Sequence, residues 1–105
     1  MRRELIFTDE ALETLAQLQA DPARSGLLDQ VRKTLGLLET NLRHPSLQTH
    51  EHHRMSREVG QKVFEAYAQQ KTPAAYRVFF VYGPDIKVGN KNVPRLTVVS
   101  IARHG

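Results

Sequence analysis

The stretch AYRVFFVY, residues 75–82, decides the fold that the sequence predicts. It is an almost continuous run of aromatic and branched apolar residues, interrupted by Arg77. Such a run is typical of a strand that lies inside a sheet and is buried on both faces. We therefore expect residues 75–82 to form a central strand, with the other elements arranged around it.

Two further strands are predicted on either side of this one along the chain. The segment KVFEAYA, residues 62–68, alternates between apolar and polar side chains, and RLTVVSIAR, residues 95–103, is rich in branched residues. The segment QQKTPA is a predicted turn. Residues 83–94 are polar and rich in turn-forming residues, so we expect a long connection there. The three strands then form an antiparallel meander.

The N-terminal part of the chain predicts a short strand and two helices. ELIF, residues 4–7, is the strand, and Thr8 is a candidate N-cap for a helix that ends near Asp21. A second helix is expected from about Ala23 to Leu42, because apolar residues recur there at spacings of three and four. These apolar positions are Leu28, Val31, Leu35, Leu38 and Leu42.

The resulting element order is β-α-α-β-β-β. It predicts an α+β fold in which a helical hairpin packs on one face of an antiparallel sheet. Residues 46–61 show no clear periodicity and are expected to form a loop. A chain of 105 residues with 40% apolar residues can bury a core of its own, so we expect residues 1–105 to form a single domain.

The composition restricts the classes of protein and partner. The formal net charge is +4 and the isoelectric point is about 9.8, which favours a polyanion or an acidic protein as partner. The chain has no cysteine, which excludes disulfides and suits a reducing cytoplasm. No secretory signal peptide is predicted, and no apolar stretch approaches the roughly 20 residues of a membrane helix.

Two arginines stand on the predicted strands. If residues 75–82 and 95–103 form a hairpin, alternation of side chains predicts that Arg77 and Arg103 lie on the same face, near the same end. The opposite face, with Tyr76, Val78 and Phe80, is then the one that packs on the helices. Two fixed guanidinium groups can hold a phosphate by paired hydrogen bonds. The structural alternative is a salt bridge between Arg77 and Glu65.

The strand AYRVFFVY with its Tyr76-Arg77 pair, the closing segment LTVVSIARHG and the preceding helical hairpin resemble the RelE/ParE toxin superfamily. The resemblance covers nearly the whole chain, as pattern and topology. It implies a RelE/ParE-like fold and the toxin of a bacterial type II toxin–antitoxin pair, with an antitoxin protein as partner. RelE-like members cut mRNA on the ribosome without a metal. By position, Arg77 and Arg103 would bind phosphate, and His104 would match the C-terminal polar residue that several nuclease members use.

Metal-free RNA cleavage needs a base for the 2′-hydroxyl proton, an acid for the leaving 5′-oxygen and cations for the developing charge. The resemblance gives the cationic role to Arg77 and Arg103. Histidine can serve either proton role near neutral pH, so His104 is a candidate acid or base. Glu65 is a further candidate base. The second proton-transfer group is expected among residues 50–53.

The segment HPSLQTHEHHRM, residues 44–55, holds most of the histidines of the chain. We expect a flexible basic flap beside the sheet, and the residues predicted to contact RNA are His50, His52, His53, Arg54 and Lys62. The alternative is a solvated connection without a function. The spacing matches neither an H-E-x-x-H helix nor a cysteine–histidine zinc site, so no metal and no cofactor are expected.

Three functions remain open at this point. The first is a ribosome-dependent mRNA endonuclease toxin that acts in the cytoplasm, and it is the predicted one. The second is a ParE-like inhibitor of DNA gyrase, which binds its target without catalysis. The third is a non-toxic member that kept the fold as a nucleic-acid-binding or regulatory protein.

Overall fold

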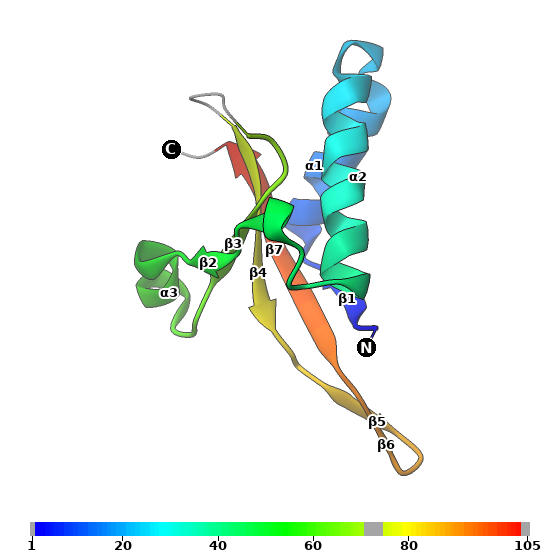
Figure 1. Cartoon of the computed structure of the whole chain (residues 1–105), viewed down its shortest axis with the longest axis vertical. Helices are drawn as coiled ribbons and strands as arrows, with labels where there is room; N and C mark the ends of the chain where they lie inside the picture. Colours follow the sequence, from blue (N-terminus) through cyan, green and yellow to red (C-terminus); the bar gives the residue numbers. More distant parts are fainter. Residues whose placement is uncertain (1, 71–74, 104–105) are drawn as a thin grey trace.

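A computed structural model describes residues 2–70 and 75–103 of the chain and has an α+β fold, as predicted. Two helices lie on one side of a twisted sheet, and a short third helix lies on the other side (Figure 1). Among the described residues, no helix has the length and apolar character needed to cross a membrane. The elements in chain order are β1 (Glu4–Phe7), α1 (Asp9–Ala20), η1 (Pro22–Arg24), α2 (Ser25–Thr40), η2 (Pro45–Leu47), β2 (His50–Glu51), α3 (His53–Val59), β3 (Phe64–Tyr67), β4 (Tyr76–Tyr82), β5 (Ile86–Val88), β6 (Lys91–Val93) and β7 (Arg95–Arg103).

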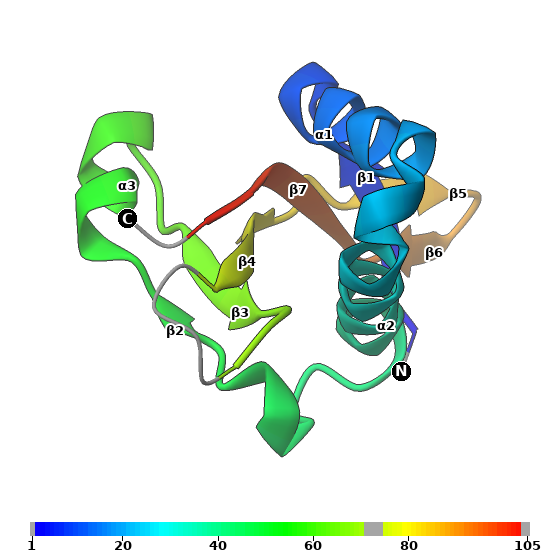
Figure 2. The same cartoon turned by 90° about the horizontal axis from the view of Figure 1, so that it is seen from above.

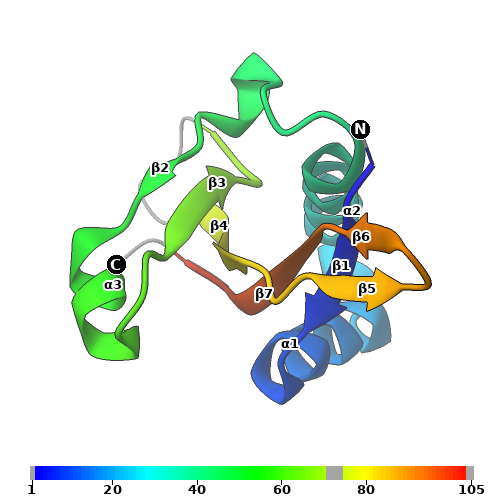
Figure 3. The same cartoon turned by 90° about the horizontal axis from the view of Figure 1, so that it is seen from below.

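The main sheet has the strand order β1-β7-β4-β3-β2. The predicted meander is confirmed, because β3 pairs with β4 and β4 with β7, both antiparallel. The N-terminal strand β1 joins the sheet parallel to β7. The connection predicted over residues 83–94 does join two paired strands, β4 and β7, but it contains two strands that were not predicted, β5 and β6, which pair as a second, two-stranded sheet. This hairpin extends away from the body of the molecule (Figures 1 and 3).

Strand β4 is buried on both faces, as its apolar run predicts. On one face Val78 and Phe80 pack with residues of α1, α2 and β7 in the larger core. On the other face Phe79 and Val81 pack with Val63 in a smaller core, which Met55 of α3 partly covers. Seen from above, the helical hairpin and α3 therefore enclose the sheet between them (Figure 2).

Capping residues and stripes of apolar side chains explain why the two long helices form. The hydroxyl of Thr8 accepts a hydrogen bond from the backbone N–H of Ala11 and donates one to the carbonyl of Val99, so the same residue starts α1 and fastens it to β7. Helix α2 ends at Thr40, two residues before the predicted end at Leu42, and its buried side chains are Leu28, Val31, Thr34, Leu35 and Leu38.

The prediction of a loop over residues 46–61 is wrong. This region contains η2, β2 and α3, and two histidine rings start its helical turns. The Nδ1 atom of His44 accepts from the N–H of Ser46, and Nδ1 of His52 accepts from the N–H of Met55. Gly60 ends α3 with a φ of 84°, which glycine adopts without strain. A helix of seven residues is too short to show an apolar period, which explains the missed prediction.

Candidate functional site

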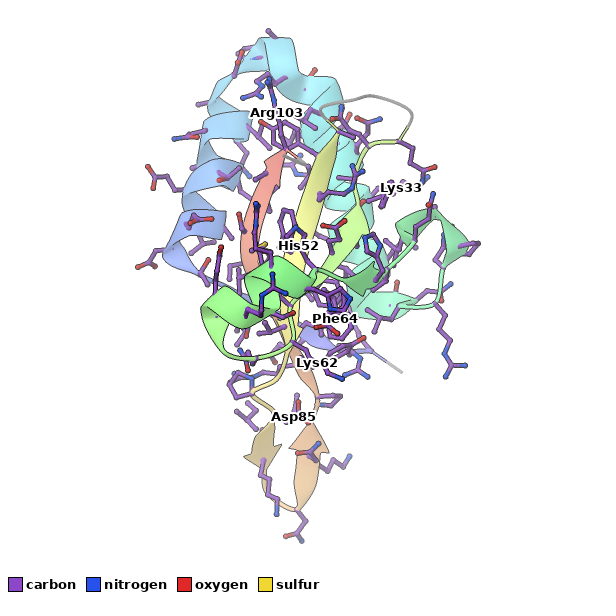
Figure 4. The ribbon with its side chains drawn as sticks, turned by 90° about the vertical axis from the view of Figure 1, so that its left-hand side faces the viewer. Lys33, His52, Lys62, Phe64, Asp85 and Arg103 are labelled. Carbon is purple, nitrogen blue, oxygen red and sulfur yellow. The ribbon has the colours of Figure 1, made fainter. Side chains whose placement is uncertain are left out.

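The predicted two-arginine site is not present, because Arg77 and Arg103 lie on opposite faces of the sheet. In the pairing of β4 with β7, Arg103 lies opposite Tyr76, whereas Arg77 lies opposite Ala102. Directly opposite residues of an antiparallel pair share a face, so a difference of one residue in register separates the arginines. Arg103 is exposed, with Cζ 6.0 Å from the Tyr76 ring, and lies beside the tip of the helical hairpin (Figure 4).

Arg77 is held on the face that α3 partly covers. Only 7% of the residue is exposed, and its Cζ atom lies 3.6 Å from the centre of the Tyr67 ring, a close cation–π contact. Its Nη1 atom is 3.5 Å from the carbonyls of Gln69 and Tyr76, which are long hydrogen bonds. Its Nε atom is buried without a hydrogen-bond partner in the described part of the chain. This cation therefore keeps one donor that no described residue uses.

Glu65 lies on the same face and is 2% exposed. Its Oε1 atom is 2.7 Å from Nε2 of His50, the residue that lies opposite it on β2. The other ring nitrogen of His50, Nδ1, is 2.8 Å from the carbonyl of Gln48. A carbonyl oxygen can only accept, so Nδ1 carries a hydrogen. The short contact between Nε2 and the carboxyl then also requires a hydrogen, so the His50–Glu65 pair holds one proton between two atoms.

His52 approaches the other oxygen of the same carboxyl. Its Nε2 atom is 3.9 Å from Oε2 of Glu65, and its ring meets the ring of Phe79 edge to face at 5.6 Å. Because Nδ1 accepts the capping hydrogen bond at the start of α3, the ring hydrogen lies on Nε2 and faces the carboxyl. The start of α3 thus fixes the orientation of His52, which lies between α3 and the sheet (Figure 4).

These side chains form one group, which we call the acid–base cluster: His50, His52, Glu65, Tyr67 and Arg77. Strands β2, β3 and β4 and the start of α3 supply its members. It combines an imidazole–carboxyl pair that holds a transferable proton with a guanidinium whose donors are not all used. This is the combination that proton transfer at a phosphate ester requires.

The remaining predicted site residues lie outside the acid–base cluster. His53 is exposed, with Nδ1 3.4 Å from a carboxylate oxygen of Glu51, and Arg54 forms a weak ion pair with Glu58 at 4.0 Å. Lys62 is exposed just before β3. His104 lies outside the described residues. The flexible flap predicted around these residues is replaced by α3 and its flanks, where His53, Arg54 and Lys62 supply surface charge.

The histidine-rich segment does not gather into a metal centre. In residues 2–70 and 75–103, no group of three histidine, cysteine or acidic side chains is placed to hold a metal ion. His44 serves the first turn of η2 instead, since its Nδ1 atom also lies 2.7 Å from the Ser46 hydroxyl.

Sequence reasoning missed the pairing of His50 with Glu65, because it left residue 50 in a loop. The alternation of Glu65 and Tyr67 along the KVFEAYA segment was the available signal that these two share a face with each other. No protein-family model, curated protein or solved structure was found to match this chain.

Proposed function

We propose that this protein is a metal-independent endoribonuclease, the toxin of a type II toxin–antitoxin pair, which cuts mRNA on the ribosome. The observation that carries the proposal is the His50–Glu65 pair, 2.7 Å apart, on the same face as the underused guanidinium of Arg77. The order of strand, helical hairpin and antiparallel meander also supports the resemblance to the RelE/ParE superfamily.

The chemistry is that of attack by the 2′-hydroxyl on the adjacent phosphorus, with departure of the 5′-oxygen. The His50–Glu65 pair supplies a proton to the leaving 5′-oxygen through the imidazole of His50, whose side chain is 49% exposed. The hydrogen on Nδ1 leaves the Gln48 carbonyl for the 5′-oxygen, while Glu65 keeps its contact with Nε2. Glu65 is buried, and it orients and charges this imidazole. Arg77 stabilises the extra negative charge on the phosphoryl oxygens. His104, which the resemblance matches to the C-terminal polar residue of several nuclease members, would then be left for the other proton transfer, from the 2′-hydroxyl.

Basic side chains around the acid–base cluster fit a polyanionic substrate. Arg54 and Arg57 are exposed on α3, and Lys62 is exposed just after it. Cations of this kind hold an RNA backbone through its phosphates, with an affinity that falls steeply as salt rises. The proposed partners are therefore mRNA on the ribosome and a cognate antitoxin protein, in the cytoplasm.

The second candidate is a member of the fold that binds nucleic acid or gyrase without cleaving anything. The observation that favours it is the burial of Glu65 and Arg77, of which 2% and 7% are exposed. A buried ionic network can serve structure alone. Under this alternative the acid–base cluster stabilises the packing of β2 and α3 on the sheet.

Induced expression in a bacterial cell tests the proposal directly. A nuclease toxin should stop growth, lower translation and leave cleaved mRNA within minutes, and the growth arrest should be relieved by Glu65→Gln. A gyrase inhibitor should produce DNA damage first, with intact mRNA. Growth arrest with intact mRNA and unchanged translation would overturn the nuclease proposal, and unimpaired growth would favour the non-toxic member.

A further inference from the structure

A surface cavity lies next to His50, which belongs to the acid–base cluster. This open cavity of about 610 Å³ lies where the segment after α2, the segment before β2 and the ends of β1, β3 and β4 meet. In Figure 1 the end of α2 and the start of β1 lie together there, and the backbone N–H of Arg3 donates to the carbonyl of Glu39. The volume is in the range of cavities that hold small organic ligands.

The wall of this cavity is aromatic on one side. Phe64 and Tyr82 line it, with ring centres 5.2 Å apart and an edge-to-face arrangement. Tyr82 is 44% exposed, unusual for a large aromatic residue at the end of a buried strand. Exposed aromatic faces are the surfaces on which proteins stack the bases of single-stranded nucleic acids.

The cavity also offers positive charge and hydrogen-bonding groups, which the phosphate and the polar edge of a nucleotide need. Arg3 and Arg43 line the cavity, and in the described part of the chain neither forms an ion pair, whereas the neighbouring Arg2 is paired with Glu39. The guanidinium of Arg3 lies over the Tyr82 ring, with Cζ 5.4 Å from the ring centre, so it stands beside the position proposed for the base. The Thr49 hydroxyl, also in the lining, is buried without a hydrogen-bond partner among the described residues. A buried hydroxyl without a partner is costly, which favours a ligand that supplies one.

The cavity and the acid–base cluster share His50. This residue lines the cavity, and its Nε2 atom contacts Glu65. Phe64 and Tyr82 lie on the opposite face of the sheet from Glu65, and His50 stands on the edge strand β2 between the two faces. A single strand bound in the cavity would reach the His50–Glu65 pair by passing around this edge. We infer that the cavity is a nucleotide subsite for single-stranded RNA, in which a base stacks on Tyr82, Thr49 hydrogen-bonds the base edge, and Arg3 and Arg43 hold the adjoining phosphate. This inference rests on the proposed function, because it names the part of the substrate next to the bond that is cut.

The test uses a probe that cannot be cleaved, a 2′-O-methyl hexaribonucleotide, titrated into the ¹⁵N-labelled full chain. The amide signals of Thr49, Arg43 and Tyr82 should shift. Tyr82→Leu should weaken binding by about 5- to 150-fold, the value of one stacked base. Arg43→Gln should lower the slope of log affinity against log salt by about 0.7, the effect of one phosphate contact on single strands. The matched control Arg32→Gln, an exposed arginine of α2 outside the cavity, should leave the slope unchanged.

Binding and cleavage separate the two proposals. If the probe binds in the cavity but natural RNA is never cleaved, the proposed function fails and the subsite remains. If RNA is cleaved but Tyr82→Leu and Arg43→Gln, both shown to be folded, bind like the wild type, the subsite is wrong. Absence of binding by the wild-type chain, or shifts confined to other residues, also overturns it.

Discussion

Replacement of Glu65 by glutamine is the substitution that separates catalysis from folding at this site. Glutamine has nearly the same shape, and its amide N–H can donate to Nε2 of a neutral His50 while Nδ1 keeps its bond to the Gln48 carbonyl. The hydrogen bond of the pair is thus kept, whereas its transferable proton is lost. The free energy of unfolding should therefore change by less than about 1.5 kcal/mol, the net value of one hydrogen bond.

The effect on cleavage should be much larger. One proton-transfer group contributes about 10²- to 10⁴-fold to the rate, which corresponds to roughly 3–5 kcal/mol of activation free energy. The assay is single-turnover cleavage of end-labelled mRNA on programmed ribosomes. The matched control is Glu58→Gln, which neutralises an exposed carboxylate on α3 whose contact with Arg54 is 4.0 Å long. If Glu65→Gln cleaves as fast as Glu58→Gln, the acid–base cluster has no part in the reaction.

Four further substitutions test other parts of the structure. Arg77→Lys keeps the charge but loses the planar contact with Tyr67, so cleavage should fall and the free energy of unfolding should drop by about 1–2 kcal/mol, measured by urea titration. Arg103→Ala should leave cleavage unchanged and alter stability by no more than about 0.5 kcal/mol, because this exposed arginine lies on the other face. Gly36→Ala should raise the free energy of unfolding by about 0.4–1 kcal/mol, since an added Cβ in α2 meets no atom within 4 Å. Hydrogen bonds from the backbone N–H of Arg95 and the side chain of Asn92 lower the pKa of Asp85, so the stability that this carboxylate adds is present above about pH 4 and lost as the pH falls through its folded value. Asp85→Asn should therefore lower stability at pH 7 and have little effect at the acid end, as measured by unfolding at several pH values.

Three of these predictions have a result that would contradict them directly. Loss of cleavage in a folded Arg103→Ala variant would restore the two-arginine site and argue against the described register. A destabilised Gly36→Ala variant would mean that α2 packs more closely at this position than the structure shows. A pH-independent effect of Asp85→Asn would exclude the charge of Asp85 as the source of its contribution.

Strong patterns in the sequence predicted the elements that bury most surface. The run around Phe79 and Phe80 predicted a strand buried on both faces, and the stripe of α2 predicted its core positions, because burial on a helix or sheet imposes a period. The shorter elements were not predicted. The β5–β6 hairpin turns at Gly89-Asn90, a pair that is a recognised hairpin signal, but strands of three residues show too little alternation to stand out.

The site was harder to predict than the fold, because it depends on register rather than on pattern. Whether Arg77 shares a face with Glu65 depends on the register of β3 with β4, and whether it shares a face with Arg103 depends on a single residue of offset between β4 and β7. Nothing local to either strand fixes that offset. The role of His52 was also hidden, since a histidine ring replaces the serine, threonine or aspartate that usually begins a helix.

The position of β7 between β1 and β4 has a consequence for biosynthesis. Residues 4–7 can pair with their neighbour in the sheet only after residues 95–98 have left the ribosome, so the N-terminal segment stays unpaired until then. Until then the apolar sides of the helical hairpin and of β4 lack the side chains of β7 that complete the larger core, Leu96, Val98 and Ile101. Such long-range pairing is slow and leaves the nascent chain exposed to aggregation or to capture by a binding protein.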